Sequence, residues 1–407
     1  MPNYLTPGVY VEEVSTGTRS IQGVGTTTAA FVGRAPLEDA HLNEAVAING
    51  WPQFLKQFTR PDSPGTDLSR AVYGFFLNGG RRCFIVNIGG AERITGGTRR
   101  REGLAVLEEV SEVAMVAAPG YSDPAAFDAL LSHAEKMKDR IAILDSPQDV
   151  DDIAQLTRIG LLEAPRTRAG EPAAASGAEQ PLKGMRPRTS DQGFGAFYFP
   201  WITTVDPMTG ERVNVPPSGH MAGIYARTDV TRGVHKAPAN EVVFGAGNLV
   251  RHITPEEQGE LNSNGVNCIR YFPNRGIRVW GARTVADAAS EWRYLNVRRL
   301  FNFVEESIAL GTGWTVFEPN DPTLWGNIRR DVGAFLSRLW NDGALLGRSE
   351  KEAFFVQCDE QTNPPESIDA GQVVALIGIA PVKPAEFIIF RIGQHAGGAE
   401  VEEVKNG

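Results

Sequence analysis

Residues 28–162 alternate short apolar runs with amphipathic stretches, and this alternation constrains the fold more than any other feature of the chain. Apolar runs of this length without polar alternation are typical of strands that are covered on both faces. Four such runs are candidate strands: residues 29–32, 83–88, 113–118 and 141–145. The pattern predicts a layered α/β domain with parallel strands and covering helices.

The stretches between these runs have helical spacing. Residues 67–78 place Leu68, Val72, Phe75 and Phe76 on one face of a helix. Residues 124–138 follow Asp123 as a helix N-cap, with Pro124 as the first helical residue. These two segments are therefore expected to cover the sheet.

The second half of the chain predicts further elements. We expect strands at residues 196–201, 353–358 and 373–380, a helix near residues 220–227, and a long helix over residues 284–310. Residues 322–346 predict another long helix, because Asp321 is a suitable N-cap, Pro322 fits the first turn and Gly347 ends the periodic pattern.

Two stretches lie outside this pattern. Residues 163–192 are rich in Ala, Gly, Pro and charge and have almost no large apolar side chain, so we expect a dispensable surface insertion. Residues 386–392 are apolar on both faces of a predicted strand and precede an acidic tail. A free strand of this kind promotes aggregation, so it should be paired in the functional state.

Composition limits the class of protein. The chain has 40 Lys and Arg against 49 Asp and Glu, a net charge of −9, which argues against a dedicated nucleic-acid binder. Three widely spaced cysteines provide neither a disulfide framework nor a Cys-x-x-Cys metal motif, and they favour a reducing compartment. No secretory leader or membrane-spanning run is present, so we expect folding in the cytoplasm without direct membrane insertion.

A search for catalytic motifs finds no phosphate-binding loop, zinc-protease motif or nucleophile elbow. Ser218, His220 and Asp145 are the residue types of a nucleophilic triad. The interpretation that we favour is that Ser218 and His220 satisfy backbone groups around a Pro-Pro turn. The histidines are scattered, so the sequence predicts no catalytic residue, no metal ligand and no cofactor.

Residues 266–300 carry a local positive charge in an acidic chain. Two acidic residues, Asp287 and Glu291, accompany seven arginines: Arg270, Arg275, Arg278, Arg283, Arg293, Arg298 and Arg299. One interpretation is a solvated helix face with partners in the same chain. The other is a surface for an anionic partner, protein rather than nucleic acid.

Several residue strings resemble a known family. The strings are residues 7–13 (PGVYVEE), 75–80 (FFLNGG), 216–229 (PPSGHMAGIYARTD), 232–238 (RGVHKAP) and 280–284 (WGART), and the likeness continues through residues 294–303 and 384–390. In this order they are similar to the tail sheath protein of contractile phages and related injection systems. The resemblance covers nearly the whole chain except residues 163–192 and the acidic tail.

The resemblance implies a structural subunit. It implies a helical sheath of stacked rings around an inner tube, which contracts and drives the tube through a membrane without consuming nucleotide. It also implies a subtilisin-like topology for the larger domain, although a fold does not establish chemistry. We therefore expect an N-terminal arm (1–22), an α/β sheath domain (23–290), a smaller α+β C-terminal domain facing the tube (291–383), and a C-terminal arm with an acidic tail (384–407).

The implied contacts can be assigned to residues. Arm strands that pair with neighbouring subunits are expected at Val9, Tyr10, Val11, Glu386, Phe387, Ile388, Ile389 and Phe390. The exposed side of the predicted helix 322–346 carries Arg329, Arg330 and Arg338, which we expect to contact the tube. Baseplate and cap proteins would be further partners, in a phage tail or a tail-like particle. The alternatives are a minor sheath paralogue next to the baseplate and a cytoplasmic α/β enzyme.

Overall fold

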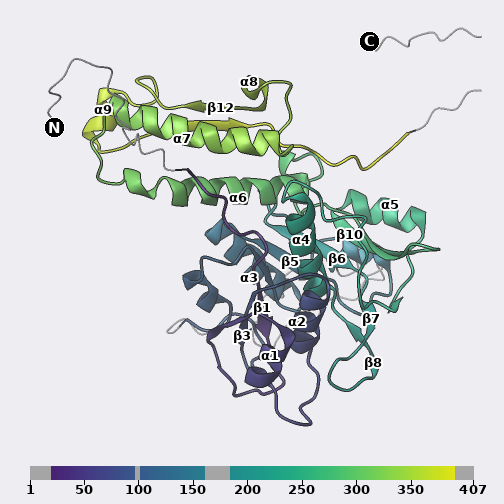
Figure 1. The fold of residues 1–407 in the computed structure, drawn as a ribbon. Helices are drawn as coiled ribbons and strands as arrows, with labels where there is room; N and C mark the ends of the chain where they lie inside the picture. The colour runs from purple at the N-terminus through teal and green to yellow at the C-terminus, as the bar shows by residue number, and fades with distance from the viewer. Residues whose placement is uncertain (1–19, 97–100, 161–183, 390–407) are drawn as a thin grey trace, which may run out of the picture.

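A computed structural model describes residues 20–96, 101–160 and 184–389. Its larger part is built on an eight-stranded sheet with the spatial order β11-β10-β6-β5-β4-β1-β3-β2 (Figure 1). The strands are β1 (Ala29–Gly33), β2 (Ala45–Ile48), β3 (Cys83–Asn87), β4 (Met115–Ala117), β5 (Ile141–Asp145), β6 (Gly195–Phe199), β10 (Val266–Phe272) and β11 (Gly276–Trp280). Neighbouring strands from β10 to β3 are parallel, and an antiparallel strand borders each side.

The predicted strands of the first half are confirmed, and they are neighbours in the sheet. Ala29 of β1 lies opposite both Cys83 of β3 and Met115 of β4, and Met115 lies opposite Ile141 of β5. Every residue of these four strands is buried, as expected for apolar runs covered on both faces.

Helices cover the sheet on both faces. Side chains that alternate along the strands, such as Phe31 and Val32, belong to two different apolar clusters. One cluster contains side chains from α1 (Trp51–Phe58), α2 (Asp67–Leu77) and α4 (Ser218–Arg232). The other contains side chains from α3 (Pro124–Met137) and α5 (Pro255–Ser263). The predicted layered α/β architecture is confirmed, whereas the subtilisin-like topology stays a prediction.

Side-chain caps fix the starts of two of the covering helices. The Thr66 side chain accepts from the Ser69 amide and the Ser69 hydroxyl accepts from the Thr66 amide, which closes a capping box at the start of α2. Asp123 accepts from the amides of Ala125 and Ala126, and Pro124 begins α3. A small sheet of β7 (Ile202–Val205), β8 (Arg212–Val215) and β9 (Asn248–Leu249) flanks the domain.

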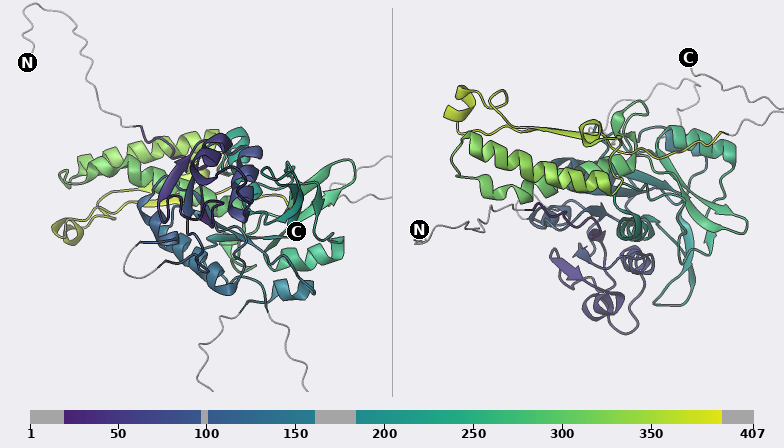
Figure 2. Two further views of the ribbon diagram at one scale, coloured as in Figure 1. Left: turned by 90° about the horizontal axis from the view of Figure 1, so that it is seen from below. Right: turned by 45° about the horizontal axis from the view of Figure 1, so that its top comes forward.

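The C-terminal part has its own apolar cluster, to which α6 (Leu295–Gly311) and α7 (Pro322–Asn341) contribute. Its other elements are α8 (Glu350–Ala353), β12 (Phe354–Gln357), α9 (Pro365–Asp369) and β13 (Leu376–Ile379). Asp321 caps α7 as predicted, by accepting from the Leu324 amide. Figure 2 shows that the α6 and α7 layer extends beyond the sheet domain on one side.

The expected helix over residues 284–310 is wrong at its start, because α6 begins only at Leu295. The Thr284 hydroxyl accepts from the Ala286 amide and donates to the Trp292 carbonyl, so it holds a turn instead of a helix. A β-bridge between Arg283 and Tyr294 closes this turn at its base.

The expected surface insertion ends earlier than predicted, because residues 184–192 pack on the sheet domain. Arg186 is buried and donates to the carbonyls of Asn264 (2.7 Å) and Val285 (3.3 Å). Ser190 is fully buried and donates to Glu135. Polar side chains attach this segment, so its lack of apolar residues was a misleading signal. Residues 163–183 lie outside the described residues.

Candidate subunit-contact surfaces

The first described residues of the chain bind to the C-terminal part. Ile21 is 1% exposed and belongs to the apolar cluster of α6 and α7. Arg338 on α7 donates to the Ile21 carbonyl, and the Val24 amide donates to the Ser307 hydroxyl at 3.0 Å. The N-terminal segment therefore enters the molecule along α6 and α7. The predicted arm residues Val9, Tyr10 and Val11 lie outside the described residues.

The last described residues are held at one point and are exposed beyond it. The Arg283 guanidinium donates to both Glu386 carboxylate oxygens, at 3.0 and 2.6 Å, and the two side chains are 12% and 15% exposed. The following side chains, Phe387, Ile388 and Ile389, are 74%, 73% and 78% exposed. Three consecutive large apolar side chains in water are unfavourable, which indicates a surface that another chain covers. Phe390 lies outside the described residues.

The C-terminal part contains a two-stranded sheet in which β12 pairs with β13, from Phe354 opposite Ile379 to Gln357 opposite Leu376. Among the described residues neither strand pairs with a third strand along this length. Phe355 is 57% exposed, and Leu376 is 51% exposed. An isolated pair of strands is only marginally stable, and its open edges offer backbone groups to further strands.

The predicted tube-contact residues lie on α7, and all three are exposed. Arg329 donates one hydrogen bond to the Cys358 carbonyl at 2.6 Å, and Arg338 donates to Ile21 as described above. Arg330 pairs with the buried Asp331 of its own helix at 3.0 Å. The apolar face of α7, including Val332 and Leu336, is buried against α6 and β12.

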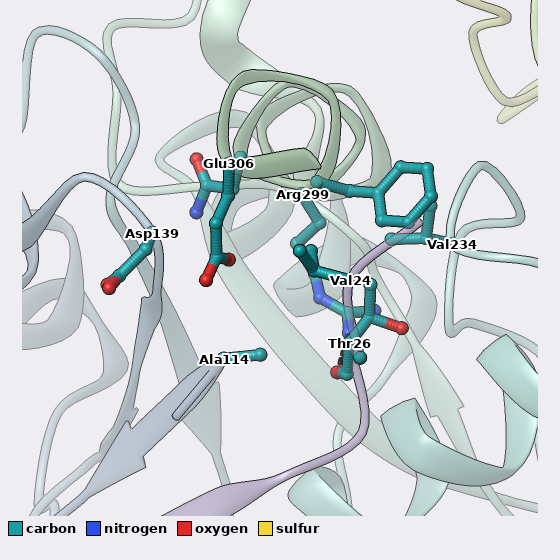
Figure 3. Close-up of a pocket in the computed structure, with 10 residues that line it drawn as sticks. Val24, Thr26, Ala114, Asp139, Val234, Arg299 and Glu306 are labelled. Atoms are coloured by element: carbon teal, nitrogen blue, oxygen red, sulfur yellow. Dashed lines mark hydrogen bonds between the residues drawn. The ribbon is translucent and has the colours of Figure 1, made fainter. Parts of the chain in front are cut away.

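A narrow pocket lies where the N-terminal segment, the sheet domain and α6 meet (Figure 3). Its lining residues include Thr26, Ala114, Asp139, Arg299 and Glu306. In Figure 3 the Glu306 carboxylate extends from α6 toward the turn that carries Asp139. Burial, reinforced by the charge of Asp139 and opposed by Arg140, raises the pKa of Glu306 to about 7. The described lining residues come from the N-terminal segment, the sheet domain and α6, so the pocket is a junction between parts of one chain.

The residues of the possible triad do not form a relay. Asp145, at the end of β5, accepts from both the amide (2.7 Å) and the hydroxyl (2.6 Å) of Ser218 at the start of α4. All three side chains are almost fully buried. Burial, opposed by these hydrogen bonds, raises the pKa of Asp145 to about 7. Asp145 therefore contacts Ser218 directly and fixes the start of α4.

The interpretation that Ser218 and His220 satisfy backbone groups was wrong. The Ser218 hydroxyl donates to the Asp145 side chain, and neither ring nitrogen of His220 has a hydrogen-bond partner among the described residues. The ring lies against Gly74 of α2, where an added Cβ would come within 2.4 Å of it. Burial lowers the pKa of His220 to about 4, so the ring is neutral near pH 7. His220 thus fills space between two helices.

Neither a metal centre nor a membrane span is found in the part of the chain that the structure describes. No three His, Cys, Asp or Glu side chains gather there in a way that could bind a metal ion. None of the helices described is both long and apolar enough to cross a bilayer.

Comparisons with protein families match most of the chain. Residues 101–285 match the phage tail sheath protein central domain, and residues 287–394 match the phage tail sheath C-terminal domain. The tail sheath protein of Vibrio phage KVP40 is 28% identical over 193 residues, which are 47% of this chain. That of Salmonella phage ViI is 27% identical over 210 residues, 51% of this chain. The matches span only 28% and 32% of these two relatives' own length.

Two solved structures match almost end to end. The first is the sheath complex of the extracellular contractile injection system PVC in its contracted state, with 29% identity and a TM-score of 0.73 over 97% of this chain and 99% of that one. The second is the contracted helical sheath of the anti-feeding prophage, with 30% identity and a TM-score of 0.72 over 97% of this chain and 100% of that one. From its fold and these matches, the chain belongs to the tail sheath family of contractile phages and injection systems.

Proposed function

We propose that this chain is the subunit of a contractile sheath, which polymerises into a helical cylinder around an inner tube and contracts to drive the tube through a target membrane. The observation that carries the proposal is the C-terminal segment, anchored by Arg283 and Glu386 and exposed at Phe387, Ile388 and Ile389. Such a segment is suited to cover a neighbouring copy. The match to contracted sheath assemblies supports the same role.

The arms add strands to the β12 and β13 sheet of neighbouring copies. Within the described part of the chain this sheet has two open edges, and it exposes apolar side chains on one side, including Phe355 and Leu376. The predicted arm strands, at residues 9–11 and 386–390, are rich in apolar side chains, which would pack against the exposed apolar side chains of this sheet. Added strands satisfy backbone groups that are otherwise open and cover apolar area at the same time.

The inner tube contacts α7 through Arg329, Arg330 and Arg338. These guanidinium groups are exposed along α7: Arg330 lies opposite the buried stripe, and Arg329 and Arg338 lie at its two edges. Exposed charge pairs contribute about 0–1 kcal/mol each, so many weak contacts would hold the tube and still release it. A sheath must do both.

The particle is assembled from subunits that fold in a bacterial cytoplasm, and baseplate and cap proteins bind its ends. The chain works by changing conformation and without catalysis: the Ser218 and Asp145 contact is buried, and no cofactor is required. Neither a cytoplasmic enzyme nor a paralogue confined to the ring next to the baseplate is favoured by any described residue.

The proposal is tested by negative-stain microscopy of the purified chain. The full chain should form hollow cylinders. A variant without residues 387–407 keeps Glu386 and its ion pair, so it should fold but remain unassembled. A matched control that lacks only residues 396–407 retains the apolar segment and should still form cylinders.

Two results would contradict the proposal. If the full chain remains monomeric at every concentration and salt tested, it does not polymerise by itself. If the variant without residues 387–407 assembles as well as the control, the apolar segment is not an assembly contact. Circular dichroism of both truncated chains distinguishes loss of assembly from loss of folding.

A further inference from the structure

The hairpin of β10 and β11 carries positive charge that the proposed function does not use. Arg270 and Arg278 lie directly opposite each other across the two strands, and Arg275 lies in the turn between them. Like charges at directly opposed positions repel each other and destabilise a strand pair. We call these three residues the arginine hairpin.

No carboxylate of the described part of the chain neutralises the arginine hairpin. Arg270 donates to the side-chain oxygen of Gln258, and its buried Nε has no partner. Arg275 donates to the Asn240 side chain at 2.8 Å, and Arg278 donates to the Asn240 carbonyl at 2.6 Å. All of these acceptors are neutral. The sequence has no Asp or Glu between residues 266 and 286.

Other arginines of the same basic run are neutralised within the chain. Arg283 pairs with Glu386 at 2.6 Å, Arg298 pairs with Glu305 at 3.2 Å, and Arg299 pairs with Asp229 at 2.6 Å. The two interpretations of this run therefore apply to different residues. Arg293 donates to the neutral Ala288 carbonyl. Three of the later arginines thus have carboxylate partners in the same chain, whereas the arginine hairpin has none among the described residues and is left for an anionic partner.

Aromatic side chains hold the arginine hairpin in position. The guanidinium carbons of Arg270 and Arg275 lie 5.4 and 5.5 Å from the ring centre of Phe272. Arg275 also lies 5.8 Å from the Trp280 ring, which is 4.5 Å from that of Phe272. Rings over the flat faces leave the N–H edges of the guanidinium groups for carboxylates. Arginine combined with aromatic rings is also the composition of strong protein contacts.

A complementary surface lies on the C-terminal part. Exposed Glu318 follows α6, and exposed Glu366 and Asp369 lie on α9. A hydrogen bond of 2.9 Å from the Asn320 side chain to the Gln372 carbonyl joins these two segments. The sequence has no Lys or Arg from residue 352 to 382. We call Glu318, Glu366 and Asp369 the acidic tip.

A second feature marks the acidic tip as a contact surface. Phe317, next to Glu318, is fully exposed and has a φ of +68°. A bulky side chain rarely adopts this left-handed backbone conformation. A partner that covers this fully exposed phenylalanine removes its apolar surface from water, which favours binding.

The two surfaces cannot meet within one molecule, because α9 and β10 lie at opposite ends of it (Figure 1). Complementary surfaces at opposite ends of one chain produce head-to-tail contacts, which build rings and helices. Resting on the proposed sheath function, we propose that the arginine hairpin of one copy binds the acidic tip of another copy in the assembled cylinder. The contact relieves the repulsion between Arg270 and Arg278 and covers Phe317.

Charge reversal and its rescue test this proposal in the full chain. One variant carries Arg275→Glu and Arg278→Glu, and another carries Glu366→Arg and Asp369→Arg. Each should lower the fraction of protein that sediments as cylinders about tenfold, because like charges then face each other. A chain with all four substitutions should recover assembly, since opposite charges again face each other. A control with Arg60→Glu and Arg212→Glu, two exposed arginines elsewhere, should assemble like the unmodified chain.

The outcomes separate this proposal from the proposed function. If the unmodified chain forms no cylinders, the sheath function fails first. If it does, and the hairpin reversal assembles like the control, the arginine hairpin is not a contact. If both reversals block assembly but the fourfold variant does not recover, the acidic tip is not its partner. Should the Glu variants unfold, Arg275→Gln with Arg278→Gln must still lower assembly, or the proposal is wrong.

Discussion

Arg299 on α6 and Asp229 on α4 form a two-point ion pair, with N···O distances of 2.9 and 2.6 Å. Both side chains are 3% exposed. The Thr26 hydroxyl donates to the same carboxylate at 2.6 Å, and Arg299 donates to the Thr26 carbonyl at 3.2 Å. One buried pair thus connects the N-terminal segment, the sheet domain and the C-terminal part.

Replacing Asp229 by Asn should destabilise the chain strongly. The Arg299 guanidinium would remain buried without its counter-charge, and breaking a buried pair in this way costs about 3–5 kcal/mol. Urea denaturation of the unassembled chain would measure the loss. The exposed pair Arg34 and Glu38 provides the control, because Glu38→Gln should change stability by about 1 kcal/mol or less. Equal effects of the two substitutions would contradict the structural role of Asp229.

Glu306 should make stability depend on pH. Its pKa is raised to about 7 by burial and by Asp139, whereas an unfolded glutamate has a pKa of about 4.3. The folded chain therefore binds this proton more tightly, and stability should fall as the pH rises from about 4.3 to about 7. Asp145, whose pKa is also about 7, acts in the same direction.

The variant Glu306→Gln isolates this contribution. It should match the unmodified chain near pH 4 and become the more stable of the two at pH 8, because it no longer places a charge in the junction. Thermal denaturation from pH 4 to pH 8 measures the difference, with the exposed Glu260→Gln as control. A difference that does not change with pH would show that folding leaves the pKa of Glu306 unshifted.

The sequence predicted the elements whose burial follows a simple period. The strands at β1, β3, β4 and β5, the helix α2 and the capped helices α3 and α7 were all expected from local pattern. Apolar runs and N-caps act over a few residues, so they can be recognised without knowledge of the tertiary fold. The exposed apolar segment that begins at Phe387 could be recognised in the same way, because its apolar side chains are consecutive in the sequence.

Features that depend on distant contacts could not be predicted. The segment that contains Arg186 and Ser190 was expected to belong to a surface insertion because it has few apolar residues. In the structure Asn264, Val285 and Glu135 supply its hydrogen-bond partners. Likewise, seven arginines in one run look equivalent in the sequence. Only the fold brings Asp229 and Glu386 to some of them, whereas no described carboxylate pairs with the hairpin.

The proposed tube contact should respond to charge reversal on α7. Arg329→Glu with Arg330→Glu should abolish assembly around the tube protein and leave tube-free sheath, because the buried stripe of α7 is unchanged. Raising the salt from about 0.05 to 0.5 M should weaken the native contact by screening. Cosedimentation of sheath with tube protein measures both effects. Unchanged binding and unchanged salt dependence would exclude these arginines as the contact.

The close packing of α2 against α4 should not tolerate an added methyl group. A Cβ at Gly219 would lie 2.3 Å from the Ala71 carbonyl oxygen, and one at Gly223 would lie 2.5 Å from that of Phe75. Backbone atoms cannot move aside as a flexible side chain can. Gly219→Ala and Gly223→Ala should therefore each cost about 1–3 kcal/mol, although alanine is the better helix former.

Gly326 on α7 provides the opposite case, since no atom lies within 4 Å of its Cβ position. Gly326→Ala should stabilise the chain by up to about 1 kcal/mol through helix propensity alone. Thermal denaturation of the three variants compares the two effects directly. If Gly219→Ala is as stable as Gly326→Ala, α2 and α4 can move apart without cost. The close approach of Gly219 to Ala71 would then not determine where α4 lies beside the sheet.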